Sequence, residues 1–201
     1  MLFSPNRFNK NEFMDLIDKK NNVILDFGSG VGIWDNTNLD PRIKKIFLYD
    51  PNYKAIKLSK KKYKKNKKIY FITKEDLRSK IFLKKNKVNI ILLNSVAQYI
   101  CKKELQKILF NFKKKISNKK LKIIITDIPE YSRFIEIFLL LLFDFLRFWQ
   151  AFKLILNKEY HNTLFHTNNL DIKYLKTKFK IIKYKNLNYF KFRKTFILKK
   201  N

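Results

Sequence analysis

The apolar positions of this chain fall into short continuous runs, separated by segments with helical spacing. Such runs, rich in β-branched residues, predict strands that are buried on both faces. The segment Glu104 to Ile116 repeats apolar residues at three- and four-residue steps, which predicts an amphipathic helix. Strands that alternate with helices indicate a parallel sheet covered on both faces. The five predicted strands are Val23 to Leu25, Lys45 to Tyr49, Ile69 to Ile72, Val88 to Leu93 and Leu121 to Thr126.

The end of the chain has a different pattern. Phe179 to Lys185 and Arg193 to Lys199 read as two strands joined by a short loop without a helix, which makes them antiparallel. The expected fold class is therefore α/β: a single domain over residues 1–201, doubly wound, with a seven-stranded, mostly parallel sheet and an antiparallel C-terminal strand pair. Ligands of such sheets bind at the carboxyl ends of the strands, near the point where the strand order reverses.

A segment over residues 134–166 is predicted to be a helical insertion that caps the substrate side of the site. From Phe134 to Leu156 it is strongly apolar, but Glu136, Asp144 and Arg147 interrupt it. Its longest uncharged run is far shorter than the roughly 20 residues that a membrane-spanning helix needs. Two alternatives stay open: burial against its own domain or a second subunit, or peripheral contact with a membrane or a lipid-linked substrate.

The formal net charge of +30 raises the question of a nucleic-acid partner. The chain has 40 Lys and only 6 Arg, together with many Asn, Ile, Phe and Tyr, all residues with AT-rich codons. Bidentate recognition of phosphate and bases prefers Arg. Nucleic acid is therefore possible but not favoured, and composition bias is the simpler explanation.

Cys101 is the only cysteine, so an internal disulfide is excluded. It falls near the start of the predicted helix, where we expect a core position rather than a catalytic one. The first residues show no secretory signal, and with two histidines and one cysteine no metal site is expected. These features lead us to expect a cytoplasmic protein.

All three glycines of the chain fall within one five-residue window, directly after the first predicted strand: Gly28, Gly30 and Gly32. An ordinary strand-to-helix turn needs at most one, so this backbone is expected to adopt positive φ angles or to approach a ligand closely. Proteins that bind nicotinamide or flavin dinucleotides use the spacing G-x-G-x-x-G, whereas this chain has G-x-G-x-G.

The run from Asp26 to Gly32 resembles the first motif, D-x-G-x-G-x-G, of the class I S-adenosylmethionine-dependent methyltransferases. The resemblance implies that the loop binds S-adenosylmethionine, with Asp26 near its methionine part and Ser29 in the loop. Asp50 follows the second strand, 20 residues after Gly30, where a carboxylate can accept both ribose hydroxyls. The alternative for Asp50 is that it only caps the helix that follows Pro51.

Two acids follow the third strand, Glu75 and Asp76, and the resemblance implies that one of them accepts from the adenine amino group. The spacing leaves open which one. The segment Val88 to Ile100 is similar to the fourth motif of the family, which places four polar residues beside the methyl group. For Asn94 and Ser95 the alternative is a role as helix caps. The four are Asn94, Ser95, Gln98 and Tyr99.

The segment Lys122 to Pro129 resembles the fifth motif and brings Asp127 to the substrate side, where Tyr131 and Tyr160 are also expected. Histidine titrates near neutral pH, so His161 and His166 are candidate general bases for an acceptor hydroxyl, or else ordinary surface residues. The fourth motif lacks both the Asp/Asn-Pro-Pro-Tyr of amino-methylating base enzymes and a Pro-Cys nucleophile.

Three functions are compatible with this pattern. The first is methyl transfer from S-adenosylmethionine to an oxygen or nitrogen of a small-molecule or carbohydrate-like acceptor. The second is RNA methylation, which the charge favours and the low arginine content opposes. The third is a non-catalytic module that only binds the cofactor. The sequence does not fix the oligomeric state.

Overall fold

The computed structural model describes residues 10–116, 120–129, 172–184 and 193–200. Within them the sheet has seven strands in the order β3-β2-β1-β4-β5-β7-β6. The first five strands are parallel, and β7 is antiparallel to both β5 and β6. The predicted fold class, including the antiparallel C-terminal pair, is confirmed. The strands are β1 (Asn22–Phe27), β2 (Ile43–Tyr49), β3 (Ile69–Phe71), β4 (Ile90–Asn94), β5 (Lys122–Pro129), β6 (Phe179–Tyr184) and β7 (Arg193–Lys200).

The strands match the apolar runs of the sequence to within a few residues at each end. The largest difference is at β5, which continues three residues further than its run. The predicted amphipathic helix is α5 (Lys102–Lys115), which buries Leu105, Leu109 and Phe112.

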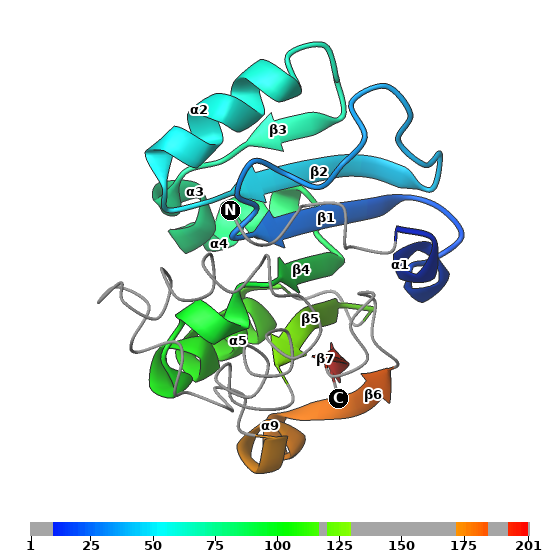
Figure 1. Ribbon diagram of the computed structural model, residues 1–201. Helices are drawn as coiled ribbons and strands as arrows, with labels where there is room; N and C mark the ends of the chain where they lie inside the picture. Colours follow the sequence, from blue (N-terminus) through cyan, green and yellow to red (C-terminus); the bar gives the residue numbers. More distant parts are fainter. Residues whose placement is uncertain (1–9, 117–119, 130–171, 185–192, 201) are drawn as a thin grey trace, which may run out of the picture.

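The remaining helices cover the sheet and the loops at its edge (Figure 1). Asn52 caps α2: its side-chain oxygen accepts hydrogen bonds from the backbone N–H groups of Lys54 and Ala55. A short 3₁₀ helix, η2 (Ala97–Tyr99), follows β4. The other helices are α1 (Lys10–Leu16), α2 (Tyr53–Lys62), α3 (Lys74–Arg78), α4 (Lys80–Lys85) and α9 (Ile172–Lys178).

Two apolar clusters lie on the two faces of the sheet. Successive residues of β1 divide between them, since Val23 and Leu25 belong to one cluster and Ile24 to the other. The first cluster includes side chains of α3, α4, α5 and α9, and the second includes side chains of α1 together with Tyr63 after α2. Both faces of the central strands are therefore buried, as the unbroken apolar runs predicted.

The strand order reverses between β1 and β4, which are direct neighbours. In Figure 1 the arrowheads of β1, β3 and β4 point to one edge of the sheet, and that of β6 points to the opposite edge. The loops after β1 and β4 therefore meet at the carboxyl edge, where ligands of this architecture bind.

Candidate functional site

The loop after β1 has positive φ angles at all three glycines: +75° at Gly28, +55° at Gly30 and +86° at Gly32. At two of them a side chain would also collide with the protein. A Cβ atom at Gly28 would lie 2.5 Å from a methyl carbon of Val96, and one at Gly32 would lie 2.6 Å from the ring of Tyr63. A Cβ atom at Gly30 would meet no heavy atom within 4 Å among the described residues. Gly28 and Gly32 are therefore required by packing, whereas the loop at Gly30 faces open space.

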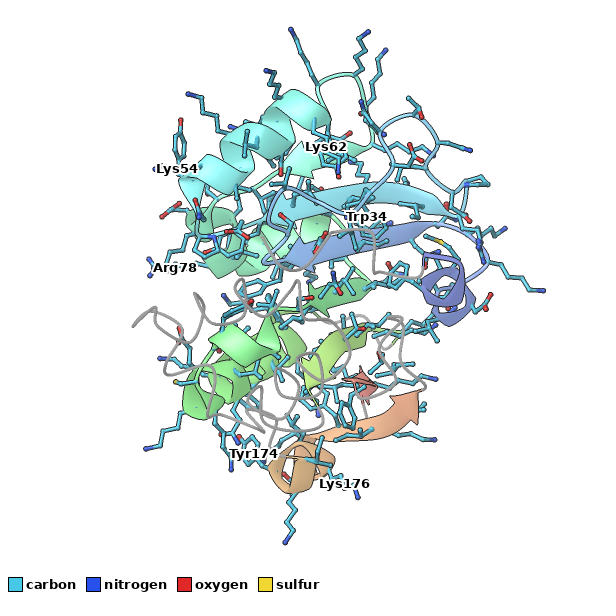
Figure 2. The ribbon with its side chains drawn as sticks, in the orientation of Figure 1. Trp34, Lys54, Lys62, Arg78, Tyr174 and Lys176 are labelled. Atoms are coloured by element: carbon cyan, nitrogen blue, oxygen red, sulfur yellow. The ribbon has the colours of Figure 1, made fainter. Side chains whose placement is uncertain are left out.

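Side chains of α2 hold this loop in place by its carbonyl groups. The Ser59 hydroxyl donates to the carbonyl of Gly30 at 2.9 Å, and the Lys62 ammonium donates to the carbonyl of Gly32 at 2.7 Å. Figure 2 shows Lys62 on the side of α2 that faces the loop. Ser59 is fully buried, so its hydrogen bond is shielded from water. The loop conformation is thus fixed by hydrogen bonds from α2 to its carbonyl groups.

Two aromatic side chains connect this loop to the buried acid Asp26. The Tyr63 hydroxyl donates to the carbonyl of Trp34 at 3.0 Å, and the indole N–H of Trp34 donates to Oδ2 of Asp26 at 2.7 Å. Asp26 is 1% exposed. Its pKa is raised to about 7, chiefly by burial and also by the charge of Asp50, against the lowering effect of the Trp34 hydrogen bond. Ionised Asp26 would therefore be stabilised by a cation nearby.

Asp50 joins the second strand to the tip of the glycine loop. Its Oδ2 accepts from the backbone N–H of Gly30 at 2.8 Å, and its Oδ1 accepts from the backbone N–H of Asn52 at 2.8 Å. The alternative that Asp50 only caps the next helix is wrong, because Asn52 is the capping residue. Pro51, between them, is exposed. Each carboxylate oxygen keeps a second lone pair with which to accept from another donor.

The acids after β3 have different surroundings. Asp76 belongs to a capping box: its Oδ2 accepts from the N–H and the hydroxyl of Thr73 at 2.8 and 3.0 Å. Glu75 is exposed, and its own backbone N–H, followed by the Thr73 hydroxyl, holds its pKa below the usual range. Burial raises the pKa of Tyr49, and the charges of Asp50 and Glu75 raise it further. Glu75 and Asp50 therefore act on the same part of the edge.

The loop after β4 contains a buried polar atom without a partner in the described part of the chain. This atom is Oδ1 of Asn94, and the hydroxyl of Ser29 in the glycine loop is in the same situation. Ser95 has a φ angle of +59°, and its N–H donates to the carbonyl of Thr126 at 3.2 Å. Neither Asn94 nor Ser95 caps a helix, so that alternative is wrong; α5 has Cys101 at its N-cap.

The other predicted substrate-side residues are only partly described. Tyr99 in η2 is 53% exposed. Gln98 also lies in η2, and Asp127 lies in β5. Cys101 is exposed, which corrects the expected core position. Tyr131, Tyr160, His161, His166 and the predicted insertion over residues 134–166 lie outside the described residues.

Three residues of the site were not found from the sequence: Trp34, Ser59 and Tyr63. Ser59 bonds the carbonyl of Gly30, and Tyr63 bonds the carbonyl of Trp34, each 29 residues away in the sequence. Trp34 in turn bonds Asp26. Residues of these types usually have ordinary apolar or capping roles, so the sequence gives no sign of these contacts. The structural role of Asp76 does have a weak signal in the sequence, because Thr73 and Asp76 have the three-residue spacing of a capping box.

The chain matches the methyltransferase small domain family over residues 6–124, which is more than half of its length. It therefore belongs to this family. The resemblance to class I S-adenosylmethionine-dependent methyltransferases is confirmed, and the protein is an enzyme of this class. No curated protein sequence matches the chain.

Solved structures show the same fold at low sequence identity. Magnesium protoporphyrin IX methyltransferase of Synechocystis PCC 6803, determined with bound S-adenosylhomocysteine, has a TM-score of 0.58 at 13% identity over 94% of this chain and 77% of that one. The N-methyltransferase NodS of Bradyrhizobium japonicum has a TM-score of 0.53 at 11% identity, covering 89% and 85%. Phosphoethanolamine N-methyltransferase 1 of Haemonchus contortus has a TM-score of 0.50 at 13% identity, covering 62% of this chain and 26% of that one.

Two features are absent from the part of the chain that the structure describes. None of the described helices has both the length and the apolar character required to cross a membrane. In the same part of the chain, no three His, Cys, Asp or Glu side chains gather in a way that could hold a metal ion.

Proposed function

We propose that this enzyme transfers a methyl group from S-adenosylmethionine to an oxygen or nitrogen of a small-molecule or carbohydrate-like acceptor. The observation that carries the proposal is the open face of the loop at Gly30, next to the carboxylate of Asp50. A ligand can lie against bare backbone there, and a sugar can reach the acid beside it.

The charges and unpaired atoms of the edge fit this cofactor. S-adenosylmethionine carries two cationic groups, an ammonium and a sulfonium, and no cation of the described residues acts on the pKa of buried Asp26. The buried oxygens of Ser29 and Asn94 lack donors within the described residues, and an amine or hydroxyl of a ligand can supply them. The full set proposed to hold the cofactor is Asp26, Gly28, Ser29, Gly30, Gly32, Asp50, Pro51, Glu75, Asp76, Asn94 and Ser95.

For the adenine contact, Glu75 is favoured over Asp76. One carboxylate oxygen of Asp76 already accepts twice from Thr73, whereas Glu75 is exposed and acts electrostatically on the same tyrosine as Asp50. In this assignment Asp76 stabilises the start of α3, and Glu75 contacts the adenine ring of the cofactor.

The bound cofactor supplies an electrophilic methyl group on a positively charged sulfur. The protein then has to align an acceptor atom with that methyl group and take up or tolerate one proton. Tyr99 is exposed after β4 and can contact the acceptor. Gln98, Asp127, Tyr131 and Tyr160 are proposed on the same side, and His161 or His166 is proposed as the general base.

Two observations favour a small acceptor over RNA. The phosphoethanolamine and magnesium protoporphyrin enzymes, which share this fold, are named for small acceptors. The chain is also rich in Lys rather than Arg, whereas bidentate recognition of RNA prefers Arg. We place this reaction in the cell interior.

Transfer of label from methyl-tritiated S-adenosylmethionine into cell extract tests the proposal. The expected result is label in the small-molecule or saccharide fraction, and no transfer by the Asp50→Ala variant. Label found only in RNA would show that the enzyme methylates RNA and not a small acceptor. Binding of S-adenosylhomocysteine without transfer to any fraction would favour the non-catalytic module.

A further inference from the structure

The lysines of this chain are not evenly distributed. Residues 51–74 hold ten lysines and no acidic residue, whereas the other 177 residues hold 30 lysines and all 16 acids. A uniform codon bias would raise the lysine content everywhere by a similar factor. The segment thus has a local excess of positive charge beyond the general bias.

Six of these lysines are exposed and have no side-chain partner within the described residues; we call them the basic face. The ammonium groups of Lys62 and Lys68 instead donate to backbone carbonyls, and that of Lys60 lies over the ring of Phe71. The acids beside this region are Asp50, which accepts from the N–H of Asn52 before α2, and Asp26 and Asp35, whose charges act on Tyr63. The members of the basic face are Lys54, Lys57, Lys61, Lys64, Lys65 and Lys67.

The geometry of α2 gathers the basic face on one side. At 100° per residue, Lys54, Lys57 and Lys61 lie opposite the side that buries Ser59. Figure 2 shows Lys54 pointing away from the sheet at the start of the helix. The lysines after the helix end continue the same charge toward β3.

Apolar side chains lie among these lysines. Leu58 is 54% exposed on the outward side of α2, and Tyr53 is 76% exposed at its first turn. The apolar side chain of Leu58, on this lysine-rich helix, is exposed to water but can enter the boundary between lipid headgroups and acyl chains. Tyrosine is enriched at the same depth of a bilayer.

We propose that the basic face docks the enzyme on an anionic lipid bilayer. Several lysines next to exposed apolar groups match the charge of anionic headgroups and the polarity of the layer beneath them. The long lysine side chains can keep their ammonium groups among the headgroups while their methylene chains cover the apolar boundary.

The observations favour a bilayer over RNA as the partner. No arginine occurs between Arg42 and Arg78, and lysine acts as a point charge without the planar, bidentate geometry of arginine. A lipid surface needs only charge density, and it also accommodates Leu58.

Docking through this surface would bring the site to the membrane. α2 begins at Tyr53, three residues after Asp50, so the start of the helix borders the carboxyl edge of the sheet. An acceptor presented at the bilayer would then be close to the site. The proposal stands on the surface alone and does not depend on the identity of the acceptor.

Cosedimentation of the full chain with vesicles tests this inference. The protein is expected to bind vesicles that contain phosphatidylglycerol in phosphatidylcholine, to release them at high salt, and to leave pure phosphatidylcholine vesicles unbound. The triple variant Lys57→Gln, Lys61→Gln, Lys65→Gln is expected to partition about a hundredfold more weakly, since each lysine near the surface contributes about a factor of five.

A matched variant removes the same number of charges from α5, where Lys103, Lys107 and Lys114 are also exposed. Changing these three residues to Gln is expected to weaken binding by less than about threefold, because they lie outside the basic face. Leu58→Ala is expected to weaken it by about fivefold. Both triple variants are expected to bind S-adenosylhomocysteine like the parent.

Three results would overturn the inference. Equal losses in the two triple variants would show that net charge alone attracts the protein. Binding to pure phosphatidylcholine would show that another, apolar surface is responsible. Loss of affinity for a single-stranded RNA oligonucleotide in the α2 variant, with vesicle binding retained, would assign the basic face to nucleic acid.

Discussion

The two loops that meet at the carboxyl edge of the sheet are built in different ways. The loop after β1 is held by its own domain: α2 bonds its carbonyl groups, and Asp50 accepts from its tip. The loop after β4 leaves the buried Oδ1 of Asn94 without a donor among the described residues. The loop after β1 is therefore fixed by several bonds before a ligand arrives, with the buried Ser29 hydroxyl still unpartnered among the described residues, whereas Oδ1 of Asn94 at the end of β4 has no such support around it.

This difference separates two tasks. A cofactor that is the same in every turnover is served by a rigid, preformed surface, because less entropy is lost when it binds. An unpaired polar atom beside that surface costs stability and persists where a ligand can satisfy it. Variants that affect only one of the two loops test the comparison.

The largest effect is expected for Gly32→Ala, which targets the rigid loop. The new Cβ atom would lie 2.6 Å from the Tyr63 ring, at a φ angle of +86°. Overpacking and left-handed strain together should lower the free energy of unfolding by about 3 kcal/mol or more. Urea unfolding measures this, and the second change Tyr63→Leu should recover part of the loss. Unchanged stability in Gly32→Ala would contradict the packing described for this loop.

An effect of similar size, but dependent on pH, is expected for Asp26. Its pKa in the folded protein is about 7, against 3.8 as the ordinary value. Because the folded state holds this proton more tightly than the unfolded state, the contribution to stability is full below about pH 4 and is lost as the pH rises through 7. The loss amounts to about 4 kcal/mol.

Asp26→Asn should remove this part of the pH dependence, since an amide oxygen still accepts from Trp34. Unfolding curves of both proteins between pH 4 and 8 provide the measurement. Parallel stability profiles for the two proteins would show that Asp26 does not titrate in this range.

Much of the fold could be predicted because each strand is a continuous apolar run and the glycines are confined to one loop. The side chains that hold the loop could not. Ser59 and Tyr63 lie 29 residues from the backbone groups they bond, and their pairing depends on how α2 packs on the sheet. A hydroxyl in a lysine-rich helix gives no sign in the sequence that it is buried.

The roles of Asn94 and Ser95 were also left undecided by residue type alone. Both are good helix caps, but the chain enters η2 after Val96 and α5 after Cys101. Only the positive φ of Ser95 and the course of β4 decide against capping. The capping box of Thr73 and Asp76 was not predicted either, although its three-residue spacing is present in the sequence.

Asp50→Ala should affect cofactor binding more than folding. The variant loses two acceptors for backbone N–H groups, at a cost of about 1 to 2 kcal/mol in stability. Loss of the proposed ribose contact should weaken binding of S-adenosylhomocysteine by about 30-fold. Calorimetry measures the affinity, with Asp35→Ala as a control at an exposed acid. Equal affinity in Asp50→Ala and the parent would refute the ribose contact.

The smallest effect on stability is expected for Asn94→Ala, in the incomplete loop. Because Oδ1 has no donor within the described residues, its removal should change the free energy of unfolding by less than about 0.5 kcal/mol. Methyl transfer should nevertheless fall, since the ligand loses an acceptor. A large loss of stability with normal transfer would show that Asn94 is a structural residue.

The central claim is that the loop at Gly30 is open because the cofactor lies there. Gly30→Asn tests it most directly, since asparagine tolerates positive φ and its side chain would enter the open space. In a calorimetric titration with S-adenosylhomocysteine, the account predicts a variant that folds normally and binds at least about a hundredfold more weakly, a loss of roughly 3 kcal/mol. A folded variant with the affinity of the parent would contradict it.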